Sequence, residues 1–350
     1  MQLPSGTIND SYEKDMAIIR TRWQWVMFIG FVVLIFVFPA FPFVSNYLLR
    51  IINNIVIAMI LVLGLNILMG YAGQVSLGQG AFMAVGAYTV ALLGHKLGVP
   101  FWLSLPAAGL SAGIVGVIFG APSLRVKGVY LALATIAAQF IILWIVRHVH
   151  AFGGVSGVPN PPAAIGTFTI NSQLSNYYLI IVVAIIMTFA AKNIARSKIG
   201  RAFVAIRDND LAAEVMGISL FRYKLLAFFI GCFFAGIAGG LWANLIGHVQ
   251  DEQFPLINSI WYTGMIMVGG QGYTLGAIIG TFLLLGVQEI VVLYGPSLSH
   301  IPGVGGSGYA GFSQFLMALI IVLFIIFEPR GLAHRWQIFK SSYRLHPFSY

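Results

Sequence analysis

The chain alternates between long apolar runs and short polar segments, and this alternation predicts its architecture. Apolar windows of about 20 residues, the length that crosses a bilayer as a helix, recur along the chain. The ten windows are residues 24–44, 50–69, 77–94, 101–120, 128–148, 177–194, 223–246, 257–270, 274–294 and 312–327. The pattern predicts an all-α, polytopic helical membrane protein with about ten transmembrane spans. The eighth window is short and bordered by Gly269 and Gly270, as in broken or re-entrant elements.

Composition supports the membrane class. The chain is 59% hydrophobic and 8% charged, with a mean hydropathy of +0.90, far from the values of soluble domains. A transmembrane β-barrel would show alternating segments of roughly ten residues, whereas this chain has unbroken apolar stretches such as Phe315 to Phe327. The single cysteine, Cys232, excludes an intramolecular disulfide and a thiolate metal cluster. The polar N-terminus contains Asp10 and Glu13 and no A-x-A site follows, so we expect the first span to be a retained anchor.

Basic residues are distributed unevenly between the two sides. Except for Arg50, Lys96 and Arg147, every Lys and Arg falls in the N-terminal segment, alternate loops or the C-terminal tail. Because Lys and Arg accumulate on the cytoplasmic side, both termini are predicted to be cytoplasmic. The chain then divides into a cytoplasmic segment at 1–23, a transmembrane domain at 24–327 and a cytoplasmic tail at 328–350. The net charge of +9 does not indicate nucleic-acid binding, since no basic patch with interleaved aromatics is long enough to form a domain.

The longest polar loop, residues 192–224, carries seven Lys or Arg residues and three Asp or Glu residues between apolar runs. In its middle, Asp208 is placed to cap a short helix in which Leu211, Val215 and Ile218 recur at helical spacing. A helix of this kind at the cytoplasmic face suits docking into a cleft of a soluble partner. The alternative is an ordinary solvated basic loop that obeys the positive-inside rule.

Two segments of the chain form a weak internal repeat. GYAGQVSLGQGAF begins at Gly70 and VGGQGYTLGAIIG begins at Val268. Many transporters build two halves around a central path from such repeats, with interrupted helices at the site. The 40 glycines also recur at one-turn spacing within spans, as between Gly109 and Gly120 and between Gly231 and Gly240. This spacing predicts close packing of helix backbones.

The predicted spans contain little acid–base chemistry. Glu289 is their only carboxylate, and it lies near the outer end of its span, where a polar mouth is the favoured role and the permeation path the alternative. The seven histidines offer no third ligand at close spacing, so no metal site is expected. The G-x-G-x-x-G pattern at residues 303–308 lacks the flanking strand and helix, and no G-x-x-x-x-G-K-[S/T] occurs. We therefore expect a non-catalytic chain without a bound cofactor, and any ATPase that drives it must be another polypeptide.

Neutral amide and hydroxyl groups are the candidates for a translocation path. Such groups can hydrogen-bond the two ends of a zwitterion without burying a charge. The candidates are Asn54, Asn66, Gln74, Ser76, Gln79, Gln139 and Gln271, and Asn244 is a further amide of the same kind. The cluster from Asn66 to Gln79, set among glycines, is the favoured pathway segment. Interhelical hydrogen bonding is the alternative role for each residue.

Five segments, in order, carry a family pattern. They are LGLNILMGYAGQVSLGQGAFMAVGAYTVALL from Leu63, LRVKGVYLALATIA from Leu124, FGGVSGVPNPP from Phe152, RAFVAIRDNDLAAEVMGISLFRYKLLAFFIGCFFAGIAGGLWA from Arg201 and EPRGL from Glu328. Together they resemble the LivM-like permease subunits of bacterial ABC importers for branched-chain amino acids. The resemblance runs from about residue 50 to residue 333, most of the chain.

The resemblance implies a multi-pass protein of the bacterial inner membrane that acts in an assembly. Permeases of this family pair with a second, homologous permease subunit. Two ATP-binding subunits use ATP on the cytoplasmic side, and a periplasmic binding protein delivers hydrophobic amino acids. The implied function is the translocation path for branched-chain or other hydrophobic amino acids, with no bond cleavage by the permease itself.

The resemblance also gives the polar loop a role, as the segment that couples the permease to the ATPases. The general E-A-A-x-x-x-G pattern of ABC importers is matched at Ala212, Ala213 and Gly217, whereas Leu211 takes the Glu position. The residues assigned to coupling on this basis are Arg207, Asp208, Asp210, Ala212, Ala213, Glu214 and Gly217. Since Asp210 and Glu214 lie on either side of the altered position, the acidic contact could be either one.

The contact with the binding protein, the transported solute and the class of membrane protein each have an alternative. Asp251, Glu252 and the outer loop at residues 152–165 are candidates for the binding-protein contact, or they are ordinary turn and solvated residues. The same family includes permeases for urea and short amides. From the residues alone, an ATP-independent channel for small neutral solutes and a structural membrane scaffold also stay open. The polar loop favours the importer, since a channel needs no surface for an ATPase.

Overall fold

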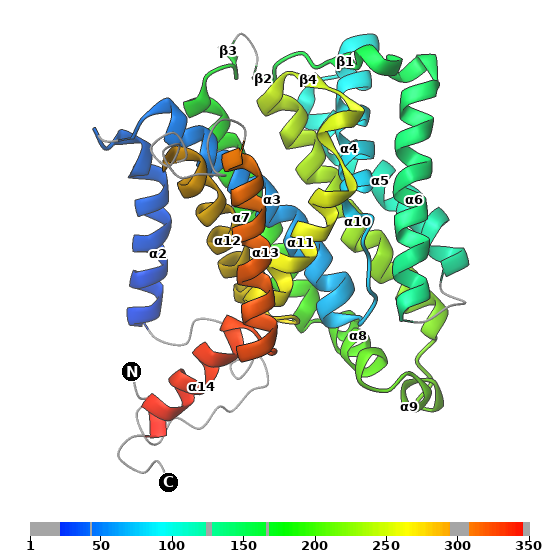
Figure 1. The fold of residues 1–350 in the computed structure, drawn as a ribbon, viewed down its shortest axis with the longest axis vertical. Coiled ribbons are helices and arrows are strands. Elements are labelled where there is room, and N and C mark those ends of the chain that lie inside the picture. Colours follow the sequence, from blue (N-terminus) through cyan, green and yellow to red (C-terminus); the bar gives the residue numbers. More distant parts are fainter. Residues whose placement is uncertain (1–21, 43, 124–127, 166–167, 295–307, 346–350) are drawn as a thin grey trace.

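The computed structural model describes residues 22–42, 44–123, 128–165, 168–294 and 308–345, and most of them are helical (Figure 1). The long apolar helices are α2 (Arg22–Val37), α3 (Asn46–Leu65), α4 (Gln79–Leu97), α5 (Phe101–Ser123), α6 (Val129–His148), α7 (Gln173–Arg196), α10 (Leu220–Ile246), α11 (Leu256–Gly269), α12 (Thr274–Tyr294) and α13 (Gly308–Phe327). The remaining α-helices are α8 (Lys198–Asp208), α9 (Asp210–Val215) and α14 (Leu332–Leu345). The predicted all-α class is confirmed.

Short elements complete the described chain. They are the 3-10 helices η1 (Phe38–Ala40), η3 (His150–Phe152), η4 (Gly154–Ser156) and η5 (Asp251–Gln253), the π-helical turn η2 (Asn66–Tyr71), and the strands β1 (Val158–Pro159), β2 (Ala164–Ile165), β3 (Phe168–Thr169) and β4 (His248–Val249). Strand β1 pairs with β4 and β2 with β3, both antiparallel. Residues 1–21 of the predicted N-terminal segment, the basic residues Arg125 and Lys127, and residues 303–307 of the glycine pattern lie outside the described residues.

Each of the ten predicted windows coincides with a long apolar helix, so the helices themselves are confirmed. By length and apolarity, six described helices could cross a membrane, or up to seven if α13 and α14, which meet at a 46° bend, form one span. The total of ten spans and the cytoplasmic termini stay predictions. The eighth window is the 14-residue helix α11. At about 1.5 Å per residue it is shorter than the roughly 30 Å hydrocarbon core, which confirms the predicted short element.

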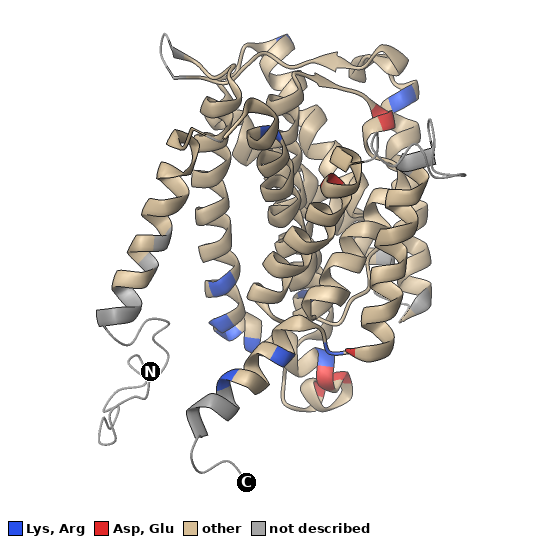
Figure 2. Cartoon of the chain, turned by 60° about the vertical axis from the view of Figure 1, so that its left-hand side comes forward, with Lys and Arg blue, Asp and Glu red and all other residues tan. Residues whose placement is uncertain are grey.

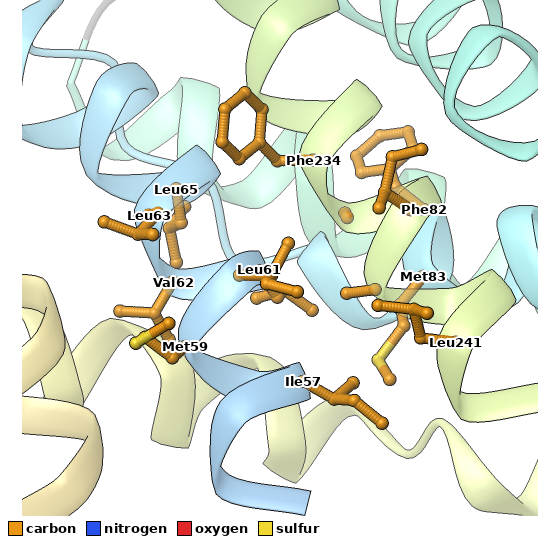
Figure 3. Close-up of a cluster of buried hydrophobic side chains, with 14 of the residues drawn as sticks. Ile57, Met59, Leu61, Val62, Leu63, Leu65, Phe82, Met83, Phe234 and Leu241 are labelled. Atoms are coloured by element: carbon orange, nitrogen blue, oxygen red, sulfur yellow. The ribbon is translucent and has the colours of Figure 1, made fainter. Parts of the chain in front are cut away.

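Helix α10 lies at the centre and packs against α3, α4 and α5. Figure 3 shows apolar side chains of three helices meeting there, among them Leu61 of α3, Phe82 of α4 and Phe234 of α10. The first two are fully buried and Phe234 is 2% exposed. Helix α3 is buried along most of its length, as expected of a helix surrounded by others.

Glycines set the distance between these helices. A Cβ added to Gly109 or Gly113 of α5 would lie 2.7 Å from the ring of Phe233 or Phe229 of α10. On α10, a Cβ added to Gly239 would overlap the backbone of Met83 in α4. The predicted close packing at glycine positions is therefore confirmed, and α10 fits into surfaces that only small residues provide.

The two ends of the bundle differ in structure and charge. Strands β1 and β4 lie at one end, and α8, α9 and α14 lie at the other (Figure 1). Lys and Arg residues gather at the end that carries α8 and α14 (Figure 2). We call this the basic end; it is the end that the positive-inside rule assigns to the cytoplasm.

Candidate functional site

The first copy of the glycine repeat lies where the chain breaks between two long helices. Helix α3 continues into the π-helical turn η2, and the chain leaves the helix at Gly73, whose φ is +68°. Glycine adopts this left-handed conformation without the penalty of a Cβ. Residues 73–78 are then non-helical until α4 begins at Gln79. We call residues 73–78 the break; π turns and breaks of this kind recur at functional sites of membrane proteins.

Side chains of neighbouring helices satisfy part of the backbone at the break. The Leu77 amide donates to Thr135 Oγ1 of α6 at 2.9 Å, and the Gly80 amide donates to Ser259 Oγ of α11 at 2.8 Å. Thr135 in turn donates to the carbonyl of Ala132 at 2.8 Å. The non-helical backbone is thus buried in protein, which is the condition under which a membrane tolerates it.

The predicted cluster of amides and hydroxyls is buried but only partly paired. Gln74 is 3% exposed, and Ser76 and Gln79 are fully buried. Gln79 Nε2 donates to the Gly231 carbonyl of α10 at 3.3 Å. Among the described residues, no partner pairs with Gln79 Oε1, Ser76 Oγ or either polar atom of the Gln74 side chain. Each unpaired buried polar group costs about 1–3 kcal/mol, so the break concentrates unsatisfied hydrogen-bonding capacity.

Gln139 joins this cluster from α6. It is fully buried, its Nε2 donates to the Phe254 carbonyl at 3.2 Å, and its Oε1 accepts from Ser259 Oγ at 2.7 Å. Ser259 and Thr135 were not predicted from the sequence. Each is a single hydroxyl in an apolar run, with no local signal to distinguish it from a residue that bonds to its own helix.

Asn66 joins the two copies of the repeat. It is 1% exposed, its Oδ1 accepts from the Gly272 amide at 2.9 Å, and its Nδ2 donates to the Tyr273 carbonyl at 3.2 Å. Gly272 and Tyr273 belong to the turn between α11 and α12, which is the second copy. A Cβ added to Gly70 would lie 3.0 Å from the Cα of Gly272. The repeat recognised in the sequence is therefore also a contact in space.

Three further candidates lie apart from this cluster. Gln271 is exposed in the turn between α11 and α12. Asn54 lies earlier in α3, where its Oδ1 is buried with no partner in the described chain. Asn244 accepts from the Ala163 amide at 2.7 Å and donates to Asn176 Oδ1 at 2.8 Å. Asn244 thus has the alternative role, interhelical hydrogen bonding.

The polar loop forms two short helices at the basic end. Helix α8 buries Gly200, Phe203 and Ile206 at helical spacing. Helix α9 is capped by Asn209, whose Oδ1 accepts from the Ala212 amide at 3.1 Å. The predicted cap by Asp208 is wrong, because Asp208 still belongs to the last turn of α8, and the chain becomes extended only at Asn209. Asn and Asp are equally good N-caps, so the sequence could not choose between them.

Helix α9 presents an apolar surface to the outside. Leu211, Val215 and Met216 are 68%, 87% and 82% exposed, while Ala213 is 4% exposed. The helix ends at Val215, two residues before Gly217, whose φ is +83°. The predicted short helix is confirmed at Leu211 and Val215, whose side chains face away from the chain, whereas Ile218 lies beyond the helix and is half-buried. Isolated helices this short are marginal in water, so α9 depends on its cap and on its anchoring at both ends.

Charged residues surround a cavity between α9 and the break. Arg207 Nη1 donates to the Gly70 carbonyl at 2.8 Å, Arg207 Nη2 lies 2.9 Å from Asp208 Oδ1, and Lys224 Nζ lies 3.9 Å from Asp210 Oδ2. The cavity measures about 370 Å³ and is lined by these four charged residues together with Ala72, Gly73, Gln74, Gly128, Leu131, Ile206 and Asn209. Three coupling candidates thus share a cavity with the pathway candidate Gln74.

The acidic candidates fall into two groups. Asp210 is paired with Lys224 in the same chain, whereas Glu214 is exposed on α9. At the opposite end, Asp251 lies 3.8 Å from Arg147 and its side chain is 11% exposed, whereas Glu252 is exposed. In each group one carboxylate is held by the chain and the other is accessible. Within the described residues, no cluster of three or more His, Cys, Asp or Glu residues could hold a metal ion.

Comparisons with known proteins agree on one family. The sequence model described as branched-chain amino acid transport system, permease component, matches residues 47–326. The high-affinity branched-chain amino acid transport system permease protein LivM of Escherichia coli is 31% identical over 319 residues, covering 84% of this chain and 72% of that protein. LivM of Salmonella typhimurium is 30% identical over the same coverage. The autoinducer 2 import system permease protein LsrC of an Enterobacter species is 27% identical over 64% of this chain and 67% of its own. No solved structure gives a significant match.

Proposed function

We infer the function of this chain from its family: it belongs to the branched-chain amino acid transport permease components. It is a multi-pass inner-membrane transport permease. We propose that it pairs with a second permease to form the path for branched-chain or other hydrophobic amino acids in an ABC importer. Separate ATPases drive the movement, and a periplasmic binding protein supplies the cargo.

The observation that carries the proposal is the position of α9. An apolar, outward-facing helix with Val215 at 87% exposure lies at the basic end and shares a cavity with the break. A channel or a scaffold has no use for such a helix, whereas an importer needs a surface that a soluble ATPase can hold. Movement of α9 by the ATPases would then reach the buried amides through rigid, packed elements.

The proposed residue roles follow from accessibility. On the coupling side, Ala212 and Ala213 shape α9, Gly217 ends it and Glu214 is the exposed acidic contact, whereas Asp210 holds α9 to Lys224. On the path we propose Gln74, Ser76, Gln79 and Gln139, whose amides and hydroxyl could pair with a zwitterion. Glu252 is the proposed contact for a basic residue of the binding protein.

The cargo is proposed on similarity. The LivM relatives, named for branched-chain amino acids, match this chain over 84% of its length, and the Enterobacter LsrC, named for autoinducer 2, matches over 64%. We therefore propose hydrophobic amino acids as cargo. A small polar solute is the second candidate, favoured by the amide-rich break.

Reconstitution tests the proposal. Proteoliposomes would contain this chain, its paired permease, the two ATPases and the binding protein, and uptake of labelled leucine would be measured with and without enclosed ATP. Excess urea would be the competitor. In parallel, Val215→Glu on α9 would be compared with Ile338→Glu on α14, which changes a residue that is 51% exposed at the same end of the molecule.

We expect ATP-dependent leucine uptake that urea leaves unchanged, lost in Val215→Glu and kept in Ile338→Glu. Uptake that ignores ATP would support the channel instead. Bound ATPases without leucine uptake would retain the importer and refute the cargo. If Ile338→Glu abolishes uptake as fully as Val215→Glu, α9 has no special role in docking.

A further inference from the structure

Arg207 connects the segment that leads into α9 to the interior of the chain. It lies in the last turn of α8, three residues before the first residue of α9. Its Nη1 donates to the Gly70 carbonyl at 2.8 Å, and its Nε and Nη2 lie 3.0 and 2.9 Å from Asp208 Oδ1. The guanidinium group is planar and its donors are fixed relative to one another. Arg207 is therefore held by α8 on one side and by the end of η2 on the other.

Glycines from both repeat copies surround this side chain. A Cβ added to Gly73 would lie 2.8 Å from Arg207 Cγ, and a Cβ added to Gly272 would lie 3.1 Å from Arg207 Nη1. Both glycines have positive φ values, +68° and +79°. Gly70 supplies the carbonyl, and Gly73 and Gly272 supply the space. We call Gly70, Gly73 and Gly272 the glycine socket.

The glycine socket links the break to the second repeat copy. Gly70 lies in η2, and Gly73 is the first residue of the break, directly before the buried amide of Gln74. Gly272 lies in the turn between α11 and α12 and is held by Asn66. A displacement of α9 therefore acts, through one side chain, on the start of the break and on the second repeat copy.

We propose that Arg207 is the positioning residue that transmits the movement of α9 to the break, with the glycine socket as its seat. The proposal rests on the proposed function in that an ATPase moves α9. It explains why both repeat copies carry glycine here, since a Cβ at Gly73 would crowd the Arg207 stem and a Cβ at Gly272 would crowd its guanidinium. It also makes Arg207 a contact within the chain rather than a contact to the ATPase.

Four variants test the proposal in the reconstituted transporter. Arg207→Met removes the charge and the donors and keeps most of the length, and Arg207→Lys keeps the charge and one donor nitrogen. Gly73→Ala fills the socket at φ +68°, and Gly98→Ala is its matched control, since Gly98 has φ +62° with open space around an added Cβ. ATP hydrolysis and leucine uptake are measured together, so that their ratio reports coupling.

We expect Arg207→Met and Gly73→Ala to lower uptake per ATP hydrolysed by about tenfold, within the usual range of coupling between two sites, with ATPase binding and hydrolysis retained. Arg207→Lys should recover part of the uptake, and Gly98→Ala should match the wild type. The double variant Arg207→Met with Gly73→Ala should be no worse than Arg207→Met, because both remove one interaction. Parallel loss of uptake and hydrolysis, or additive losses, would overturn the proposal.

Hydrogen exchange separates this proposal from the choice of cargo. In the complex with the ATPases, a non-hydrolysable ATP analogue should change the exchange of amides 70–74 in the wild type. In Arg207→Met this change should vanish while amides 210–216 stay protected by the ATPases. This readout needs no transported solute, so it holds if leucine is the wrong cargo. An unchanged response of amides 70–74 in Arg207→Met, or none in the wild type, would refute transmission through Arg207.

Discussion

Replacing Asn66 by Ala should destabilise the fold more than the same change at Asn53, although both residues lie on one continuous helical segment and are at most 1% exposed. Asn66 accepts from the Gly272 amide at 2.9 Å and donates to the Tyr273 carbonyl at 3.2 Å. Asn53 makes one bond, from Nδ2 to the Gln173 carbonyl at 3.3 Å. Its Oδ1 has no partner among the described residues.

The magnitude follows from the groups left unpaired. Asn66→Ala leaves the Gly272 amide without a partner, at about 1–3 kcal/mol. The Tyr273 carbonyl loses one bond but still accepts from the Ala277 amide at 3.1 Å, which adds about 0.5–1.5 kcal/mol, so we expect about 2–4 kcal/mol in total. Asn53→Ala removes one bond to a carbonyl that belongs to α7 and also removes an amide oxygen that is already unpaired, so we expect about 0–1.5 kcal/mol. Both changes delete the same side-chain atoms, so the cavity contributions should largely cancel.

Cys232 provides the assay. It is the only cysteine in the chain and is fully buried, so a thiol-reactive fluorophore reports unfolding as the temperature is raised in detergent. A difference of about 2 kcal/mol corresponds to roughly 4 °C between the two midpoints at about 2 °C per kcal/mol for a large chain. Equal midpoints for Asn66→Ala and Asn53→Ala would refute the account of Asn66 as the link between the repeat copies.

Three further changes have distinct expected results. Gly239→Ala should lower the free energy of unfolding by about 1–3 kcal/mol through overpacking against α4, whereas Gly30→Ala, with open space for its Cβ, should be neutral or stabilising in the same thermal assay. Asn209→Ala should destabilise α9 by about 0.5–2 kcal/mol and speed hydrogen exchange at residues 210–216. Asp208→Ala should speed this exchange less. Faster exchange in Asp208→Ala than in Asn209→Ala would show that Asp208 is the cap. Val215→Glu should weaken ATPase binding in a pull-down without moving the thermal midpoint, since Val215 is 87% exposed.

The helices could be predicted because apolar length is a local property. Each window coincides with a helix, and the glycines of α5 and α10 pack as their spacing indicates. What the sequence could not predict is pairing between distant residues. Thr135 accepts a hydrogen bond from the Leu77 amide in the break, and Ser259 accepts one from the Gly80 amide at the start of α4. These pairs are 58 and 179 residues apart, and the sequence near Thr135 and Ser259 gives no sign of them.

The sequence predicted the buried amides and the loop helix of the candidate site, but not every residue of either. The amides from Gln74 to Gln79 are buried together, as expected of a cluster set among glycines, but Gln271 is exposed. The helix in the polar loop was predicted from its apolar spacing, whereas its cap was placed one residue early. The orientation of Arg207 depends on the fold of both repeat copies, so its inward contact could not be read from the loop alone.

The contact between Gly70 and Gly272 also limits how such sequences can diverge. A Cβ at Gly272 would lie 3.2 Å from the Gly70 carbonyl oxygen, and one at Gly70 would meet the Gly272 backbone. Part of each obstacle is a side chain, Asn66 at Gly70 and Arg207 at Gly272, but the backbone part would remain after any second-site side-chain change. Among natural relatives we expect these two positions to stay glycine wherever Asn66 is kept, while Gly286 and Gly311, where an added Cβ meets nothing within 4 Å, should drift freely.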